Sequence, residues 1–125
     1  MGAAVTLVLH QQEDMDCGVC ALAMYLGIPY PDVLRAVTVS DRHQGKQGLW
    51  TATIQRVAKR LGHPLRKVKR VDWEQGYGIL LLPAHASILR NGLVIDNGCV
   101  WDADAYLAHW CLEPTDCELL TNETH

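Results

Sequence analysis

The chain has 125 residues, of which 49% are hydrophobic and 20% charged, with a formal net charge of −3 at pH 7. This length and composition predict one globular domain spanning residues 1–125, and the negative charge argues against a nucleic-acid or anionic-membrane partner. No apolar run reaches the roughly 18–20 residues of a membrane span, and the N-terminus lacks the basic region of a signal peptide, so a cytoplasmic protein is expected.

Helical patterns dominate the first half of the chain. Residues 3–9 are expected to form a short strand or an extended arm that leads into a polar loop. From Cys17 onward, apolar residues at helical spacing predict a helix that Gly27 ends. Two further helices are expected at residues 29–37 and, after a polar, glycine-rich loop, at residues 49–62.

After Pro64 the pattern changes to strands. An alternating segment, an apolar run and a hairpin are expected at residues 65–71, 77–83 and 85–96. The Asn91-Gly92 pair predicts a type I′ turn within the hairpin, and a second Asn-Gly pair follows it. Residues from 103 onward are weakly patterned. Helices followed by a meander of strands predict an α+β fold, with N-terminal helices packed on a C-terminal antiparallel sheet.

Cysteines offer the first chemical signal. Five are present (Cys17, Cys20, Cys99, Cys111 and Cys117), and an odd number without an export signal predicts reduced thiols. Cys17 and Cys20 are spaced C-x-x-C at the start of the first predicted helix. His109 and Cys111 could complete a zinc site with them, but the spacing of Cys111 and Cys117 does not form a convincing second pair. No metal is therefore expected.

The same pair could also be a thioredoxin-like redox motif, because a helix N-terminus favours the thiolate. Only sixteen residues precede Cys17, which is too few for the strand, helix and strand that normally come first in that fold. A thiol oxidoreductase using Cys17 and Cys20 remains an alternative function.

The third interpretation makes Cys17 a nucleophile, with a partly exposed thiol at the helix start and Cys20 as a small apolar residue of the helix. Such a site needs an oxyanion donor, a histidine as general base, and a carboxylate or amide that orients the histidine. Candidates for all of these occur along the chain.

Three segments carry a resemblance to a known family: "QQEDMDCGVCALAMYLGI" (11–28), "GLWTATIQRVAKRLG" (48–62) and "LLLPAHASILRNGLVID" (80–96). Together they resemble the bacteriocin-processing (double-glycine leader) peptidases, a branch of the papain-like cysteine peptidases. The resemblance runs with gaps over roughly residues 7–96. It implies a papain-like fold, a peptide or protein substrate and no cofactor.

Carried over by this resemblance, Cys17 matches the nucleophile and His85 matches the general base that opens a strand. Gln11 matches the oxyanion-hole glutamine, and its neighbour Gln12 is the alternative. The sequence departs from the family pattern directly after the histidine, where Ala86 and Ser87 replace an aromatic-valine pair.

The other histidines compete with His85 for the role of general base. Surface or capping roles are expected for most of them (His10, His43, His63 and His125). His109, in "YLAHWC", is the closest rival, and a buried packing role is favoured for it. His85 opens a strand between apolar segments, where a purely structural histidine is hard to explain.

The predicted hairpin selects the orienting residue. With a two-residue turn, Ser87 faces Asp96, and His85 becomes a diagonal neighbour of Asp96 on the same face of the sheet. Asp102, which follows the next strand, is the alternative, and Asn97 is a third choice.

The expected activity is that of a cysteine peptidase or amidohydrolase, which cleaves a peptide, isopeptide or related acyl bond. A Cys-His-Asp triad with a glutamine oxyanion hole would perform the reaction. A catalytically degenerate module that binds a peptide without cutting it is the second alternative.

Overall fold

The computed structural model describes residues 17–38, 51–83, 85–96 and 98–122. The helices are α1 (Cys17–Leu26), α2 (Tyr30–Ala36), α4 (Thr51–Arg60), α5 (Ala103–Trp110) and the short 3-10 helix η2 (Pro114–Asp116). The strands are β1 (Leu65–Val68), β2 (Tyr77–Leu82), β3 (His85–Arg90), β4 (Leu93–Asp96), β5 (Cys99–Asp102) and β6 (Glu118–Asn122). The strand or arm expected at residues 3–9 lies outside the described residues.

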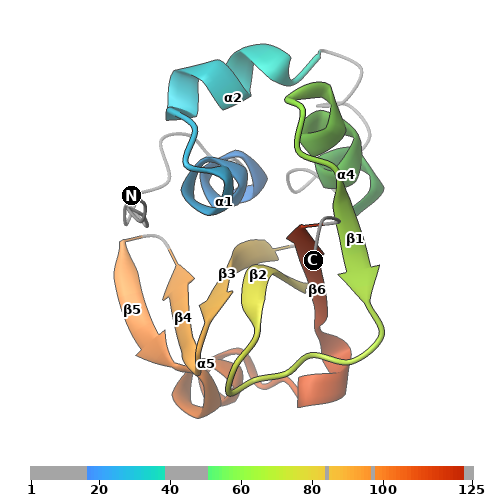
Figure 1. The fold of residues 1–125 in the computed structure, drawn as a ribbon. Coiled ribbons are helices and arrows are strands. Elements are labelled where there is room, and N and C mark those ends of the chain that lie inside the picture. The colour runs from blue at the N-terminus through green and yellow to red at the C-terminus, as the bar shows by residue number, and fades with distance from the viewer. Residues whose placement is uncertain (1–16, 39–50, 84, 97, 123–125) are drawn as a thin grey trace.

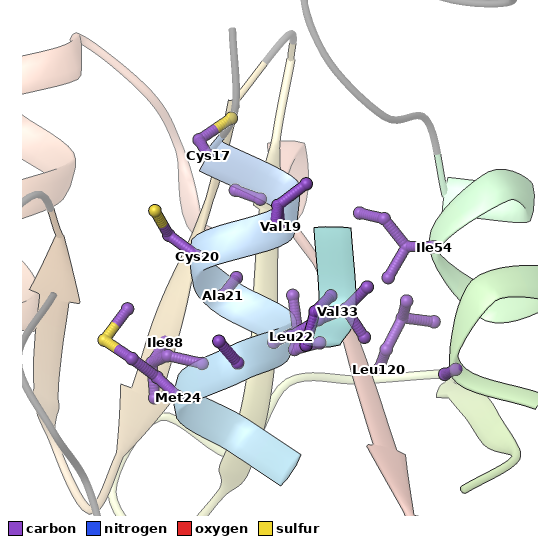
Figure 2. Close-up of a cluster of buried hydrophobic side chains, with 14 of the residues drawn as sticks. Cys17, Val19, Cys20, Ala21, Leu22, Met24, Val33, Ile54, Ile88 and Leu120 are labelled. Carbon is purple, nitrogen blue, oxygen red and sulfur yellow. The ribbon is translucent and has the colours of Figure 1, made fainter. Parts of the chain in front are cut away.

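The three helices expected in the first half of the chain are confirmed. In α1, every residue from Cys17 to Met24 is buried, and Gly27 ends the helix with a φ of 68°, a conformation that glycine adopts without steric cost. Figure 2 shows these side chains packed between the sheet and the other two helices. Among the described residues, no single helix is long and apolar enough to cross a membrane, and α1 and α2 meet that length and hydropathy only as a pair bent by 118°.

The described strands form one six-stranded antiparallel sheet in the order β1-β6-β2-β3-β4-β5. The predicted hairpin of β3 and β4 is confirmed, with Arg90 opposite Leu93. Asn91 and Gly92 have φ values of 49° and 85°, as a type I′ turn requires at both central positions. Beyond the hairpin, β5 pairs with β4, so the meander from β2 to β5 is also confirmed.

The C-terminal part differs from the expectation of a weakly patterned tail. It contains helix α5 and strand β6, and β6 lies between β1 and β2 rather than at an edge of the sheet. The adjacent residues Leu119 and Leu120 are both buried, one on each face of the sheet. The last strand of the sequence therefore joins β1 to the rest of the sheet.

Two hydrophobic layers cover the two faces of this sheet. One layer packs α1, α2 and α4 against residues such as Ile88, Ile95 and Leu120. The other packs α5 against residues such as Leu89 and Val94. In Figure 1, α1, α2 and α4 lie together at one end of the molecule, and α5 lies at the opposite end beyond the strands. This arrangement is the α+β fold that the sequence predicts.

Candidate active site

Cys17 is the first residue of α1. Its side chain is 8% exposed, so the thiol is more buried than the sequence analysis expected. The start of a helix carries a partial positive charge from unpaired backbone N–H groups, which favours an anion such as a thiolate. Figure 2 shows Cys17 at one end of α1. Cys20 lies one turn further along the helix, on the side of α1 where Ile88 of the sheet is located.

His85 and Asp96 form a close pair between β3 and β4. His85 Nε2 donates to both carboxylate oxygens of Asp96, at 2.9 Å from Oδ1 and 2.8 Å from Oδ2. The two side chains are 17% and 11% exposed. The hairpin register therefore brings together the two residues that the sequence analysis placed on one face.

The imidazole of His85 also interacts with Cys17. Burial lowers the pKa of His85, but hydrogen bonds with Asp96 and Cys17, together with their negative charges, outweigh this effect and raise it from 6.5 to about 10. Because Nε2 is bonded to Asp96, Nδ1 is the ring nitrogen left for the cysteine sulfur. The arrangement is a line of three groups in which His85 stands between a thiol and a carboxylate.

Asp102 has a different role. It is the N-cap of α5, and its side chain accepts a hydrogen bond from the backbone N–H of Asp104. It is exposed and lies opposite Leu93 in the pairing of β4 with β5. The structure thus brings Asp96 to His85 and uses Asp102 to begin a helix.

Helix α5 contributes two aromatic residues that the sequence analysis did not include in the site. The hydroxyl of Tyr106 donates to Asp96 Oδ2 at 2.8 Å. The ring of Trp110 stacks on the ring of His85, with 5.1 Å between centroids and 29° between planes. Their spacing of four residues puts them on one face of α5, which is the only sequence signal that could have paired them.

The rival base His109 lies on the same helix but is exposed. Its ring packs against the rings of Trp101 and Trp110, with centroids 4.9 and 5.7 Å away. A packing role was expected and is found, but the expectation of burial is wrong. His63 is half-buried after α4, and the remaining histidines, His10, His43 and His125, lie outside the described residues.

Cys17 and Cys20 line a small cavity of about 10 Å³ with Met24, Ala86, Ser87, Ile95 and Asp96. This volume is about that of one water molecule on the same measure. All five cysteines lie in the described residues, and none of them forms a disulfide. In that part of the chain, no group of three or more His, Cys, Asp or Glu side chains is arranged to hold a metal ion.

The predicted oxyanion donor Gln11 and its alternative Gln12 lie outside the described residues, as does Asn97.

No protein-family model and no curated protein sequence matches the chain. Solved structures do. One is a double-glycine motif protease from an AMS/PCAT transporter, in complex with the leader peptide; its TM-score is 0.63 at 18% identity, over 97% of this chain and 94% of that one. A second is the peptidase domain of Streptococcus ComA, a bifunctional ABC transporter involved in a quorum-sensing pathway; its TM-score is 0.61 at 16% identity, over 91% and 95% of the two chains.

The chain has a papain-like fold. The first of these neighbours is a double-glycine motif protease, the kind of peptidase that the three sequence segments resemble, and the second is a peptidase domain. The similarity covers 97% and 91% of this chain, so it extends well beyond the three segments that carry the resemblance.

Proposed function

We propose that this protein is a cysteine peptidase in which Cys17 is the nucleophile, His85 the general acid and base, and Asp96 the group that orients His85. The observation that carries this proposal is the position of His85, which is bonded to the Asp96 carboxylate through Nε2 and interacts with the Cys17 sulfur. Peptidase domains with the same fold support it.

The reaction follows from the geometry. The Cys17 thiolate attacks the carbonyl carbon of the scissile bond, and the bond to the leaving nitrogen breaks as His85 donates its proton to that nitrogen. The product of this step is a thioester on Cys17. His85, now neutral, takes a proton from a water molecule that attacks the thioester, which releases the acid and restores the pair. Asp96 stabilises the imidazolium through both oxygens during the cycle.

The tetrahedral intermediate of each step carries a negative oxygen that needs donors. We assign this role to the side-chain amide of Gln11 and the backbone N–H of Cys17. The resemblance of residues 11–28 to double-glycine peptidases supports the assignment of Gln11, and the position of Cys17 at the start of α1 supports that of its N–H.

We further propose a peptide substrate with a double-glycine cleavage site. The support is the neighbour solved as a double-glycine motif protease with a leader peptide. Cleavage of isopeptide and simple amide bonds proceeds through the same kind of tetrahedral intermediate. Compounds with these bonds are therefore the second group of substrates in the panel to be tested, beside double-glycine peptides.

The test compares Cys17→Ala with Cys20→Ala. Both changes remove one buried thiol from the same helix, and the thiols line the same cavity, so Cys20→Ala controls for packing. Wild-type protein and Cys20→Ala should cleave double-glycine peptides, as followed by mass spectrometry of the products, whereas Cys17→Ala should show no cleavage while keeping its circular dichroism spectrum.

Each alternative gives a different result. A binding module without catalysis would leave the whole panel uncut by the wild-type protein while still binding a peptide. A thiol oxidoreductase would lose activity equally in both variants and would form a Cys17–Cys20 disulfide under mild oxidation.

A further inference from the structure

Tyr106 bonds to the same carboxylate of Asp96 that His85 contacts. Its side chain is fully buried at 0% exposure, in the layer between α5 and the sheet. Its hydroxyl donates to Asp96 Oδ2 at 2.8 Å. The same oxygen accepts the hydrogen bond from His85 Nε2, so a single carboxylate oxygen joins the tyrosine to the histidine.

The Asp96 carboxylate is 11% exposed, and a buried carboxylate is costly unless hydrogen bonds satisfy its oxygens. The single N–H of His85 Nε2 is shared by both carboxylate oxygens, at 2.9 and 2.8 Å, so this contact alone holds the plane of the carboxylate only loosely. A second donor on Oδ2 restricts that plane. The hydroxyl therefore determines which orientation of the carboxylate His85 meets.

Tyr106 is suited to act as a permanent donor. Burial is the main cause that raises the pKa of its phenol, and the charge of Asp96 and the hydrogen bond to Asp96 raise it further. The net change is upward, so the hydroxyl keeps its proton throughout the range in which His85 changes its charge.

We propose that Tyr106 is a positioning residue of the active site: by donating to Asp96 Oδ2, it holds the carboxylate in the orientation that supports His85 as the partner of Cys17. This inference rests on the proposed peptidase function and extends the working site to helix α5, which lies outside the three segments that carry the family resemblance.

The first test is Tyr106→Phe. This change removes the hydroxyl and keeps the ring with its edge contacts to Trp101 of β5 and Trp110 of α5. A hydrogen bond to a charged group is lost, so kcat should fall by about tenfold. KM should stay within twofold, because the orientation of the Asp96 carboxylate affects the protonated His85 that takes part in the reaction and does not affect the bound peptide.

Tyr25→Phe is the matched control. Tyr25 is a partly buried tyrosine near the end of α1 remote from Cys17, and its hydroxyl bonds with Thr121 Oγ1 and the backbone N–H of Asn122. It should leave kcat and KM unchanged. Thermal unfolding of both variants verifies that each is folded at the assay temperature.

A double-mutant cycle separates positioning from a general structural role. In an Asp96→Ala background, Tyr106→Phe should cause no further loss of kcat, since the group through which Tyr106 acts is gone. The inference is overturned if the two losses multiply, or if Tyr106→Phe alone keeps kcat within twofold of the wild-type value.

The same cycle can be measured without a substrate, as the rate at which iodoacetamide alkylates Cys17 at pH 6, located by mass mapping. Tyr106→Phe should slow alkylation several-fold, and should have no further effect after Asp96→Ala. If these rates show coupling while the wild-type protein cuts no peptide in the panel, the peptidase proposal fails and the positioning role holds. If peptide cleavage depends on Cys17 but neither cycle shows coupling, the positioning role fails alone.

Discussion

At the scale of single residues, the charge state of His85 decides the pH range of the proposed reaction. The charge of Asp96 and the hydrogen bond to it are among the causes that raise the pKa of His85 to about 10. The imidazolium is the proton donor to the leaving group, so activity should persist up to about pH 10 and decline above it.

Asp96→Asn tests this link. The amide keeps the shape and a hydrogen-bond acceptor but removes the negative charge, so the pKa of His85 falls and His85 loses its proton at lower pH. The alkaline limb of the profile of kcat/KM against pH should move toward acid by on the order of one pH unit or more. Asp102→Asn is the control, because Asn caps a helix as well as Asp does and Asp102 caps α5. A shift with Asp102→Asn and none with Asp96→Asn would reverse the assignment of the orienting residue.

The part of the site that could be predicted from the sequence depends on local geometry. The two-residue turn at Asn91-Gly92 determines the register of β3 against β4, and this register alone places His85 within reach of Asp96. The contacts of Tyr106 and Trp110 depend on how α5 packs against the sheet, which no short-range pattern specifies. Gln11 remains a prediction from resemblance.

At the scale of elements, α1 and the hairpin were predictable because caps, turns and periodicity are encoded within a few residues. Strand β6 was not. Its neighbours in the sheet come from distant parts of the sequence, and its burial pattern has two adjacent buried leucines, Leu119 and Leu120, between less buried residues. A central strand of five residues with this composition resembles a polar tail when it is considered alone.

The turn between β3 and β4 gives a prediction at this scale. Gly92 has a φ of 85°, and a Cβ there would meet no atom closer than 3.9 Å, so the cost of Gly92→Ala comes from backbone strain. The free energy of unfolding should fall by about 1–2 kcal/mol. Asn91→Gly keeps a residue that adopts positive φ and should change it by less than about 0.5 kcal/mol. Urea denaturation measures both, and equal losses would show that the turn is not under this strain.

At the scale of the whole molecule, the proposed active site joins the two layers. Cys17 comes from the helical layer on one face of the sheet, while Tyr106 comes from α5 on the other. His85 and Asp96 lie on strands that both layers share. The relative placement of the layers therefore matters for the chemistry, and the strands β2, β3, β4 and β6 each contribute buried residues to both cores.

This placement predicts that the chain unfolds as one unit. Leu119 packs with α5 and Leu120 with α1 and its neighbours, so Leu119→Ala and Leu120→Ala damage opposite layers. Each should lower the free energy of unfolding by about 2–5 kcal/mol, and Leu93→Ala, at a leucine 46% exposed, by about 0.5 kcal/mol or less. In both core variants, far-ultraviolet and near-ultraviolet circular dichroism should report the same midpoint in urea, as one cooperative domain requires. Separate midpoints, with Leu119→Ala affecting only the aromatic signal, would instead show two layers that unfold independently.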